Sequence, residues 1–358
     1  MRRIIAILSV LIVAALISGC VAPQAIQLTR MDGQDMVQRL GTGEIAGYIG
    51  WEPYNAEAVV KGDGRVLMSS GEIWAHHPCC IIAYDYNWHQ QTDNADEILR
   101  RVALVHLRST EWVNAAKDPN SPNRAKLIQY SVDFTKRDPD VIEKALENID
   151  FDYRTDVSGT TTYIQKLSEY EIFNQDNWDQ SGFETPSDYA SSLITDEYVR
   201  WATEHRDEPF ADIKLDPPVA IKIGYLIEDL HQVAFWVAWH EGWFEEVGIN
   251  VQIAEGAPFQ NGAFEMTKGF KLNKVDVGYL GTAPACVHRI NSNDFSTDDA
   301  RIKIIAGVNY NGSAIVVGKD VNTMKDLAGQ TVGYPGPGTV QHFLFLKAAE
   351  EAGIKVAQ

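Results

Sequence analysis

The sequence has no long run of lysine and arginine. Its 358 residues carry 31 Lys and Arg against 49 Asp and Glu, so the formal net charge is −18 at pH 7. Proteins that bind nucleic acids neutralise the phosphates with clustered basic side chains. The composition therefore predicts that this protein has no nucleic-acid partner.

Cysteine is also scarce, with four residues in the whole chain, Cys20, Cys79, Cys80 and Cys286. If Cys20 belongs to an export signal, as argued below, three cysteines remain, and an odd number does not suggest a disulfide framework. The neighbours Cys79 and Cys80 seldom bond to each other. A bond from either of them to Cys286 stays open.

Residues 76–80, His-His-Pro-Cys-Cys, carry side chains that suit zinc or copper. Adjacent residues on an extended chain point to opposite faces, however, and no second cluster of such residues is evident. The chain also has no Gly-x-Ser-x-Gly elbow, no His-Glu-x-x-His pair and no Walker loop. We therefore expect no metal, no cofactor and no catalytic residues, and we expect that the protein is not an enzyme.

The apolar run at the N-terminus is too short for a comfortable membrane span. It covers residues 4–17, between the basic start Met1-Arg2-Arg3 and the small residues Ser18-Gly19-Cys20. This pattern is typical of a secretory signal. Residues 17–20 resemble the lipobox of prokaryotic lipoproteins, which implies lipidation of Cys20; a plain signal peptide or an N-terminal anchor with an incidental cysteine is the alternative. We expect residues 1–25 to be this signal with a short tether, and the mature protein to be exported and anchored to the outer face of the cytoplasmic membrane.

Strand-like and helical segments alternate near both ends of the chain. This alternation predicts an α/β fold with mostly parallel sheets flanked by helices. The strands are expected at residues 26–31, 46–49, 65–70, 81–84, 219–225, 248–253, 275–280, 302–308, 314–317 and 331–334. Helical spacing predicts a helical block over residues 95–205, with its last helix at 188–203, a polar linker at 206–218 and a long helix at 229–246.

A Gly/Pro turn at residues 335–338 leads from a predicted strand into a helix that begins near Thr339. Unpaired N–H groups at a helix start attract anionic or polar ligand groups. Residues 281–285 form a second strand-to-helix turn of this kind. An ordinary connection is the alternative interpretation of each turn.

Several segments together carry a family resemblance. They are Ile-Lys-Ile-Gly-Tyr at 221–225, the helix end at 241–249, Val-Asp-Val-Gly at 275–278 with Gly-Thr-Ala-Pro-Ala at 281–285, and residues 324–329. With these, residues 219–349 resemble the amino-terminal part of ABC-transporter substrate-binding proteins of the nitrate, sulfonate, taurine and thiamine-precursor group. Residues 26–150 resemble the carboxyl-terminal part of the same family. This resemblance is carried by residues 35–46 and by Trp-Glu-Pro-Tyr at 51–54.

The two parts stand in reversed order relative to that family. Joining residues 355–358 to residues 26–29 would restore the expected helix–loop–strand passage. This order implies a circular permutation, which surface termini tolerate. A truncated or misassembled tandem copy is the alternative.

The resemblance implies a two-lobed periplasmic-binding-protein-like fold of type II. Each lobe would be a mixed, mostly parallel sheet flanked by helices. Residues 26–76 with 314–358 would form a split lobe, and residues 77–313 a continuous lobe.

The resemblance also implies a solute-binding lipoprotein of an ABC importer. It would be a monomer that closes on a small anionic or zwitterionic solute, such as a sulfonate, taurine or nitrate, and serves a permease and an ATPase. The alternative is a thiamine-precursor (pyrimidine) binding protein or a related biosynthetic enzyme. A structural role is the alternative for each expected contact residue: Trp51, Glu52, Tyr225, Thr282, Ala283, Tyr310, Gly338, Thr339, Gln341 and His342.

Overall fold

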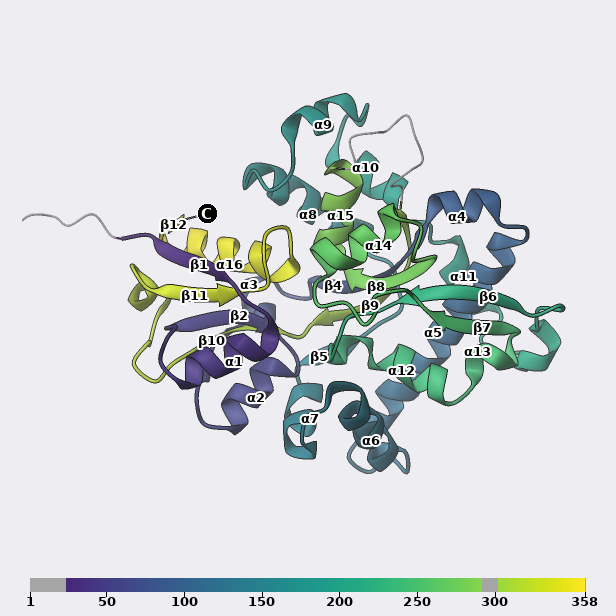
Figure 1. Cartoon of the computed structure of the whole chain (residues 1–358), viewed down its shortest axis with the longest axis horizontal. Helices are drawn as coiled ribbons and strands as arrows, with labels where there is room; N and C mark the ends of the chain where they lie inside the picture. Colours follow the sequence, from purple (N-terminus) through teal and green to yellow (C-terminus); the bar gives the residue numbers. More distant parts are fainter. Residues whose placement is uncertain (1–23, 292–301, 358) are drawn as a thin grey trace, which may run out of the picture.

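The computed structural model describes residues 24–291 and 302–357 (Figure 1). Two six-stranded sheets organise it, with strand orders β12-β1-β11-β2-β10-β3 (sheet A) and β5-β9-β4-β8-β6-β7 (sheet B). Helices flank both sheets, so the expected two-lobed α/β class is confirmed. We call the sheets with their flanking helices lobe A and lobe B.

Lobe A combines the two ends of the described chain, which appear in purple and yellow in Figure 1. Strand β10 pairs antiparallel with β2 and β3, while β1, β2, β11 and β12 pair in parallel. Its elements are β1 (Ile26–Arg30), α1 (Gly33–Gly41), β2 (Gly47–Trp51), α2 (Tyr54–Val60), β3 (Arg65–Ser69), α3 (Ser70–Ile73), β10 (Ser313–Val317), η4 (Met324–Leu327), β11 (Thr331–Tyr334), α16 (Val340–Glu351) and β12 (Val356–Ala357).

Lobe B is built from the middle of the chain. Strand β4 lies in the interior of sheet B, is buried along its whole length and pairs antiparallel with β8 and β9. The strands are β4 (Pro78–Asp85), β5 (Ile149–Phe151), β6 (Val219–Gly224), β7 (Ile249–Ile253), β8 (Val277–Gly281) and β9 (Ile302–Asn311). The first helices are α4 (Tyr86–Gln91), α5 (Ala95–Lys117), α6 (Arg124–Thr135), α7 (Pro139–Leu146), α8 (Val157–Glu169), α9 (Gln175–Gln180), α10 (Pro186–Leu193) and α11 (Glu197–Glu204).

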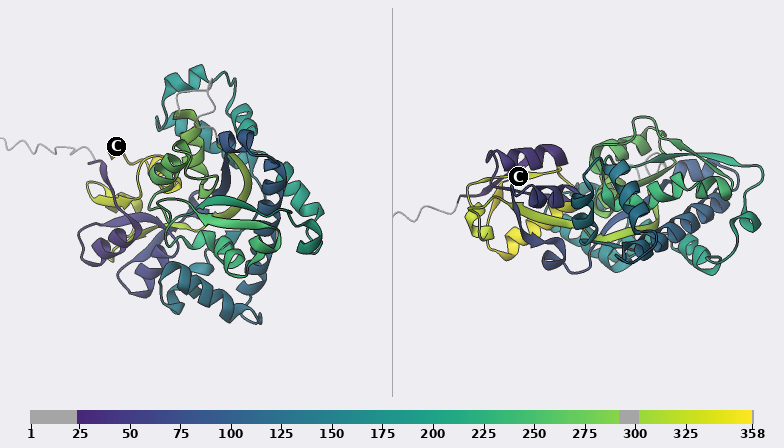
Figure 2. Two further views of the ribbon diagram at one scale, coloured as in Figure 1. Left: turned by 45° about the vertical axis from the view of Figure 1, so that its right-hand side comes forward. Right: turned by 90° about the horizontal axis from the view of Figure 1, so that it is seen from below.

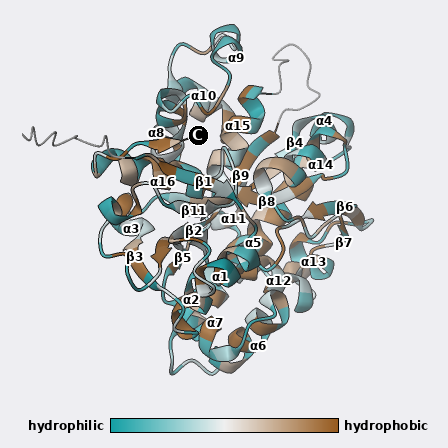
Figure 3. Ribbon diagram, turned by 60° about the vertical axis from the view of Figure 1, so that its left-hand side comes forward, coloured by the Kyte–Doolittle hydropathy of each residue, from teal (hydrophilic) through white to brown (hydrophobic). Residues whose placement is uncertain are grey.

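The remaining helical segments of lobe B begin with η1 (Phe210–Ile213), which lies inside the expected linker at 206–218. The others are η2 (Leu230–Gln232), α12 (Val233–His240), α13 (Trp243–Glu246), the π-helical η3 (Gly262–Met266), α14 (Thr267–Lys271) and α15 (Thr282–Asn291). Outward helices such as α4 carry mostly hydrophilic residues, whereas hydrophobic residues gather on the sheets (Figure 3). No helix of residues 24–291 and 302–357 is long and apolar enough to cross a membrane.

Two expected helices are interrupted in the structure. The segment 188–203 divides into α10 and α11 because Ile194 leaves the helix to form a bridge with Ile304 of β9. The segment 229–246 divides into η2, α12 and α13, and Gly242 between the last two has a φ of 77°. The single-helix prediction was wrong at both places.

The chain passes between the sheets twice. The first passage runs from β3 through α3 to β4, and the second runs from β9 through Gly312 to β10. Figure 2 shows the two lobes side by side in a second orientation. All other connections stay within one sheet, so these two segments are the covalent links between the lobes among the described residues.

Strand β12 lies beside β1, with Ile26 opposite Val356. The Ile26 N–H donates a hydrogen bond of 2.9 Å to the carbonyl oxygen of Lys355. This places the two ends of the described chain next to each other in sheet A. The permuted order itself stays a prediction, and Cys20 with the rest of residues 1–23 lies outside the described residues.

Candidate functional site

A cavity of about 50 Å³ lies between the two lobes. Such a volume holds a few water-sized groups. Side chains and backbone of both lobes line it, and none of these described residues is a lysine or arginine. They are Trp51, Pro335, Thr339, Val340 and Gln341 of lobe A, and Cys79, Cys80, Leu226, Asp229, His231, Gln260, Asn261, Gly262, Gly281 and Pro284 of lobe B.

The start of α16 faces this cavity. Thr339 is the N-cap residue, and its hydroxyl oxygen accepts a hydrogen bond of 3.1 Å from the His342 N–H. The same hydroxyl donates to the Gly336 carbonyl oxygen at 2.8 Å, which fixes the Gly/Pro turn before the helix. The first N–H groups of a helix have no intrahelical partner. Val340 and Gln341, the first two residues of α16, are both on the cavity lining.

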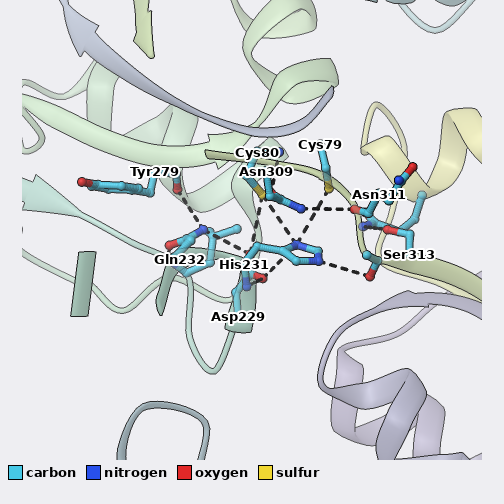
Figure 4. A network of polar contacts seen from close by, with 12 residues as sticks. Cys79, Cys80, Asp229, His231, Gln232, Tyr279, Asn309, Asn311 and Ser313 are labelled. Atoms are coloured by element: carbon cyan, nitrogen blue, oxygen red, sulfur yellow. Dashed lines mark hydrogen bonds and ion pairs between the residues drawn. The ribbon is translucent and has the colours of Figure 1, made fainter. Parts of the chain in front are cut away.

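Four buried side chains of lobe B form a compact cluster at the cavity (Figure 4). The Nδ1 atom of His231 is 3.8 Å from the Sγ atoms of both Cys79 and Cys80. It is 3.2 Å from Oδ1 of Asp229, and Oδ2 of Asp229 is 3.9 Å from Sγ of Cys80. The three ligand atoms of Cys79, Cys80 and His231 lie within 4.8 Å of one another, so this group could hold a metal ion.

A β-bulge explains why two adjacent cysteines reach the same histidine. In the pairing of β4 with β9, Pro78 lies opposite Tyr310 and Cys80 opposite Asn309, so Cys79 is an extra residue. A bulge of this kind redirects side chains that would otherwise alternate. The expectation that Cys79 and Cys80 point to opposite faces was therefore wrong. Both cysteines and Cys286 are free thiols.

The second passage between the lobes orients His231. The carbonyl oxygen of Gly312 accepts a hydrogen bond of 3.1 Å from Nε2 of His231 and one of 3.0 Å from the Glu52 N–H. Since a carbonyl only accepts, Nε2 carries a proton, and Nδ1 faces the two sulfur atoms and Asp229. Gly312 has a φ of 85°, and a Cβ atom on it would lie 2.2 Å from Nε2 of His231.

The titration of the cluster reflects its burial and its mutual charges. Burial lowers the pKa of His231, but the Cys79 thiolate and the Asp229 carboxylate more than offset this and raise it to about 9. Burial raises the pKa of Asp229 to about 6. The contact between the two thiols lowers the pKa of Cys79 and raises that of Cys80. Without a bound ion, these shifts favour a thiolate on Cys79 beside a protonated His231.

Three of the expected contact residues line the cavity: Trp51, Thr339 and Gln341. The Trp51 ring meets Tyr54 edge to face, with ring centroids 5.1 Å apart. The side-chain amide of Gln341 donates to the Ser313 hydroxyl at 3.0 Å, which ties α16 to β10.

The structure places the other expected residues around the cavity but not on its lining. Tyr225 packs on Phe134, Phe235 and Trp236. Thr282 is buried and donates to the Cys79 carbonyl oxygen at 3.2 Å, and Ala283 is buried beside it. Tyr310 stacks on His76 at 3.8 Å, Gly338 lines a separate hollow with Pro337, and the His342 ring lies against Tyr334.

Glu52 is buried, and its carboxylate points toward the protein rather than the cavity. Its oxygens accept hydrogen bonds from the Asn148 side chain at 2.7 Å and from the Ala56 N–H at 3.0 Å. Asn148 belongs to lobe B, so this bond joins the lobes. Burial raises the pKa of Glu52 to about 7 in spite of these donors.

An ion cluster joins the lobes beside the cavity. Arg137, between α6 and α7, pairs with Glu57 of α2 at 2.6 Å and with Glu228 at 3.0 Å. It also donates to the Gln34 side chain at 2.7 Å and lies over the Tyr54 ring. Arg137 and Glu57 are both nearly buried, so these bonds hold the two lobes together.

The sequence interpretation missed Asp229, His231 and Asn261. Asp229 and His231 were included in an expected long helix, where their side chains would point in different directions. The signal that could have revealed them is the Asp-x-His spacing before the apolar helix, because a short polar turn at a helix start often presents side chains together. Asn261 caps η3 and donates to the Pro335 carbonyl oxygen of lobe A at 2.7 Å.

Comparison with known proteins agrees with the two-part resemblance. Residues 9–129 match the model of the NMT1-like family, and residues 231–358 match the model described as NMT1/THI5 like. The nitrate/nitrite binding protein NrtA of Nostoc sp. (strain PCC 7120 / SAG 25.82 / UTEX 2576) is 26% identical over 137 residues, which are 38% of this chain. The matched part covers 30% of the length of that relative. Two separate parts of the chain are therefore similar to NMT1-type proteins, and each match covers a part of the chain.

Proposed function

We propose that this protein is the solute-binding component of an ABC importer and holds a small anionic or zwitterionic solute, such as a sulfonate, taurine or nitrate. The observation that carries the proposal is the cavity between the lobes. Trp51 and Thr339 approach it from lobe A, and Asp229 and Asn261 approach it from lobe B. A solute held there contacts both lobes at once, so its binding favours their closed arrangement.

The start of α16 is the proposed subsite for the anionic group of the solute. Helix N-termini attract negative charge through their unpaired N–H groups and the helix dipole. Thr339 and Gln341 add polar side chains at the same end. The lining offers no lysine or arginine, and it includes the carboxylate of Asp229. A zwitterion therefore fits the cavity better than a bare anion.

The second candidate solute is a neutral pyrimidine-like base. The specific observation in its favour is the Trp51 ring on the lining together with the absence of lysine and arginine among the described lining residues. Aromatic rings stack on planar bases, and side-chain amides such as that of Asn261 pair with their edges.

The proposal also covers the partners, the location and the moving parts of the protein. A permease and an ATPase would receive the solute, and the protein would act as an exported monomer anchored through Cys20. We propose binding without covalent chemistry rather than enzymatic turnover. Lobes at 26–76 with 314–358 and at 77–313 would be the units that move.

A thermal-shift screen tests this function. The purified protein is heated with taurine, alkane sulfonates, nitrate and pyrimidines in turn, because a ligand of the native state raises the melting temperature. We expect the zwitterion to give the largest shift. No shift with any of these compounds would overturn the proposed function.

A matched pair of variants locates the solute. Thr339→Ala and Thr185→Ala each remove a threonine N-cap, from α16 and α10 respectively. Each loses about 1 kcal/mol of stability. Only Thr339 lines the cavity. The solute-induced shift should shrink in Thr339→Ala and persist in Thr185→Ala; equal shifts in both variants would exclude the α16 subsite.

A further inference from the structure

We propose that the cluster of Cys79, Cys80, His231 and Asp229 is a binding site for a zinc-type divalent metal ion. Two thiolates, an imidazole nitrogen and a carboxylate form a ligand set that suits Zn²⁺. The proposal goes beyond the proposed function, and its site adjoins the solute, because all four side chains line the same cavity.

The spacing of the ligand atoms agrees with a tetrahedral ion. Bonds of about 2.3 Å to sulfur and about 2.1 Å to nitrogen or oxygen place neighbouring ligand atoms about 3.4–3.8 Å apart. The two distances from sulfur to Nδ1 of His231 are both 3.8 Å. Asp229 makes its contacts through two different oxygens, with Oδ2 at 3.9 Å from Sγ of Cys80 and Oδ1 at 3.2 Å from Nδ1 of His231. The two cysteines and His231 therefore need only small shifts to close on an ion, whereas Asp229 must turn to present one oxygen as the fourth ligand.

The bulge and the turn that form the cluster bring ligands from two distant segments. Cys79 and Cys80 come from β4, whereas Asp229 and His231 come from the turn at η2. The bulge at Cys79 costs one regular pairing position in an otherwise buried strand. Bulges of this kind often redirect side chains into functional sites, and here the bulge places both sulfur atoms on the side of His231.

The groups behind the ligands have the arrangement expected of a metal centre. A metal-binding histidine usually donates its other ring N–H to a carbonyl or carboxylate, which leaves the free nitrogen for the metal. Nε2 of His231 donates to the Gly312 carbonyl oxygen at 3.1 Å in this way. The Gln232 side chain donates to Oδ2 of Asp229 at 3.1 Å and holds that carboxylate in place.

Burial and charge give the cluster a reason to bind a cation. All four side chains are buried, and the thiol contacts to His231 and Asp229 are long for hydrogen bonds. Buried thiolates and carboxylates are stable when a cation neutralises them. The cavity lining supplies no lysine or arginine for this role. A divalent ion would displace the proton on Nδ1 of His231 and take its place among the three acidic groups.

Metal titration of the purified full chain under a non-thiol reductant tests the site. We expect one equivalent of Zn²⁺ in competition with a chromophoric chelator. Cys79→Ser, Cys80→Ser and His231→Gln should each weaken binding by at least about 10-fold, the loss that even second-shell changes cause. Cys286→Ala is the matched control, because it removes a buried thiol outside the cluster; it should bind as the unaltered protein does.

Cobalt loading provides a readout of the ligands themselves. Thiolate-to-Co²⁺ charge-transfer absorption should appear in the unaltered protein, decrease in each single cysteine variant and vanish in the double variant. Circular dichroism confirms that each variant is folded. Failure of the protein to bind either ion, or an unchanged cobalt spectrum in the double variant, would overturn the proposal. The solute screen repeated after chelation reports on the proposed function separately.

Discussion

Gly312 shows how much can depend on one backbone carbonyl. This oxygen accepts hydrogen bonds from both the Glu52 N–H and Nε2 of His231, and thus joins lobe A to the cysteine–histidine cluster. The residue has a positive φ and no room for a Cβ atom next to His231. Glycine is required here by conformation and by contact at once.

We predict that Gly312→Ala loses about 1–3 kcal/mol of stability and weakens Zn²⁺ binding, because the new methyl group displaces the His231 ring. Gly353→Ala is the control: its φ of 69° imposes the same strain, and nothing lies within 4 Å of the added Cβ atom. Urea unfolding and zinc competition measure both effects. Equal zinc affinity in the two variants would show that Gly312 does not position His231.

His106 carries a prediction about pH. It is buried on α5, and its Nε2 donates to the Gly307 carbonyl oxygen at 2.8 Å, while Nδ1 has no partner among the described residues. Burial lowers its pKa to about 4. The folded pKa lies below the unfolded value of about 6.5, so the unfolded chain takes up the proton first and stability is lost as the pH falls from about 6.5 to about 4.

His106→Gln should remove this loss, because the amide still donates and does not titrate. Between pH 7.5 and pH 5, urea unfolding should show a stability loss about 2 kcal/mol smaller in the variant than in the unaltered protein. His240→Gln, which changes an exposed histidine, should leave the pH dependence as it is. The same pH dependence in His106→Gln would contradict the assignment.

At the scale of elements, the local pattern of the sequence predicted strands and helix starts. Apolar runs placed β1, β3 and β4 within a few residues of their observed bounds, and turn chemistry placed α16 at Thr339. Features that depend on contacts between distant parts of the chain could not be predicted from the local sequence. The bulge at Cys79 depends on its pairing with β9, and the end of α10 depends on a bridge to the same strand. The cluster was missed because it needs this bulge and because its two cysteines lie far in sequence from Asp229 and His231.

Gly242 gives a test of the interrupted helix. It separates α12 from α13 with a φ of 77°, and no crowding surrounds its Cα atom. Gly242→Ala should lower stability by about 1 kcal/mol through backbone strain alone. Gly71→Ala, in α3 with ordinary contact distances, should stay within about 0.5 kcal/mol. Denaturant unfolding compares the two; a stabilised Gly242→Ala protein would mean that the helix continues through this residue in solution.

At the scale of the whole molecule, the bonds of Arg137 to Glu57 and Gln34 join lobe B to lobe A. Arg137→Ala removes a buried charged hydrogen bond to Glu57, worth about 1–3 kcal/mol, and an exposed one to Gln34. We predict a more open molecule, with a larger radius of gyration in small-angle X-ray scattering. Arg200→Ala removes an exposed pair within α11 and should leave the radius unchanged. An unchanged radius in both variants would exclude this role for Arg137.

If the order is permuted, the protein should still fold when its two ends are joined and the chain is opened at another place. We would join Ala357 to Gln24 by a short glycine–serine linker and open the chain between the exposed residues Asp207 and Glu208. Because β12 already lies beside β1, the rearranged protein should unfold cooperatively and keep its solute-induced shift. An unfolded product would count against the permutation.

The pairing of β1 with β11 and β12 has a consequence for biosynthesis. Sheet A joins strands from opposite ends of the described chain, with Gln27 opposite Thr331 and Ile26 opposite Val356. During synthesis β1, β2 and β3 leave the ribosome long before their partners exist. Lobe B, which is continuous in sequence, can form first. The edges of β1, β2 and β3 stay unpaired until the later strands have been made. The formation of lobe A is therefore the slow and aggregation-prone step of folding.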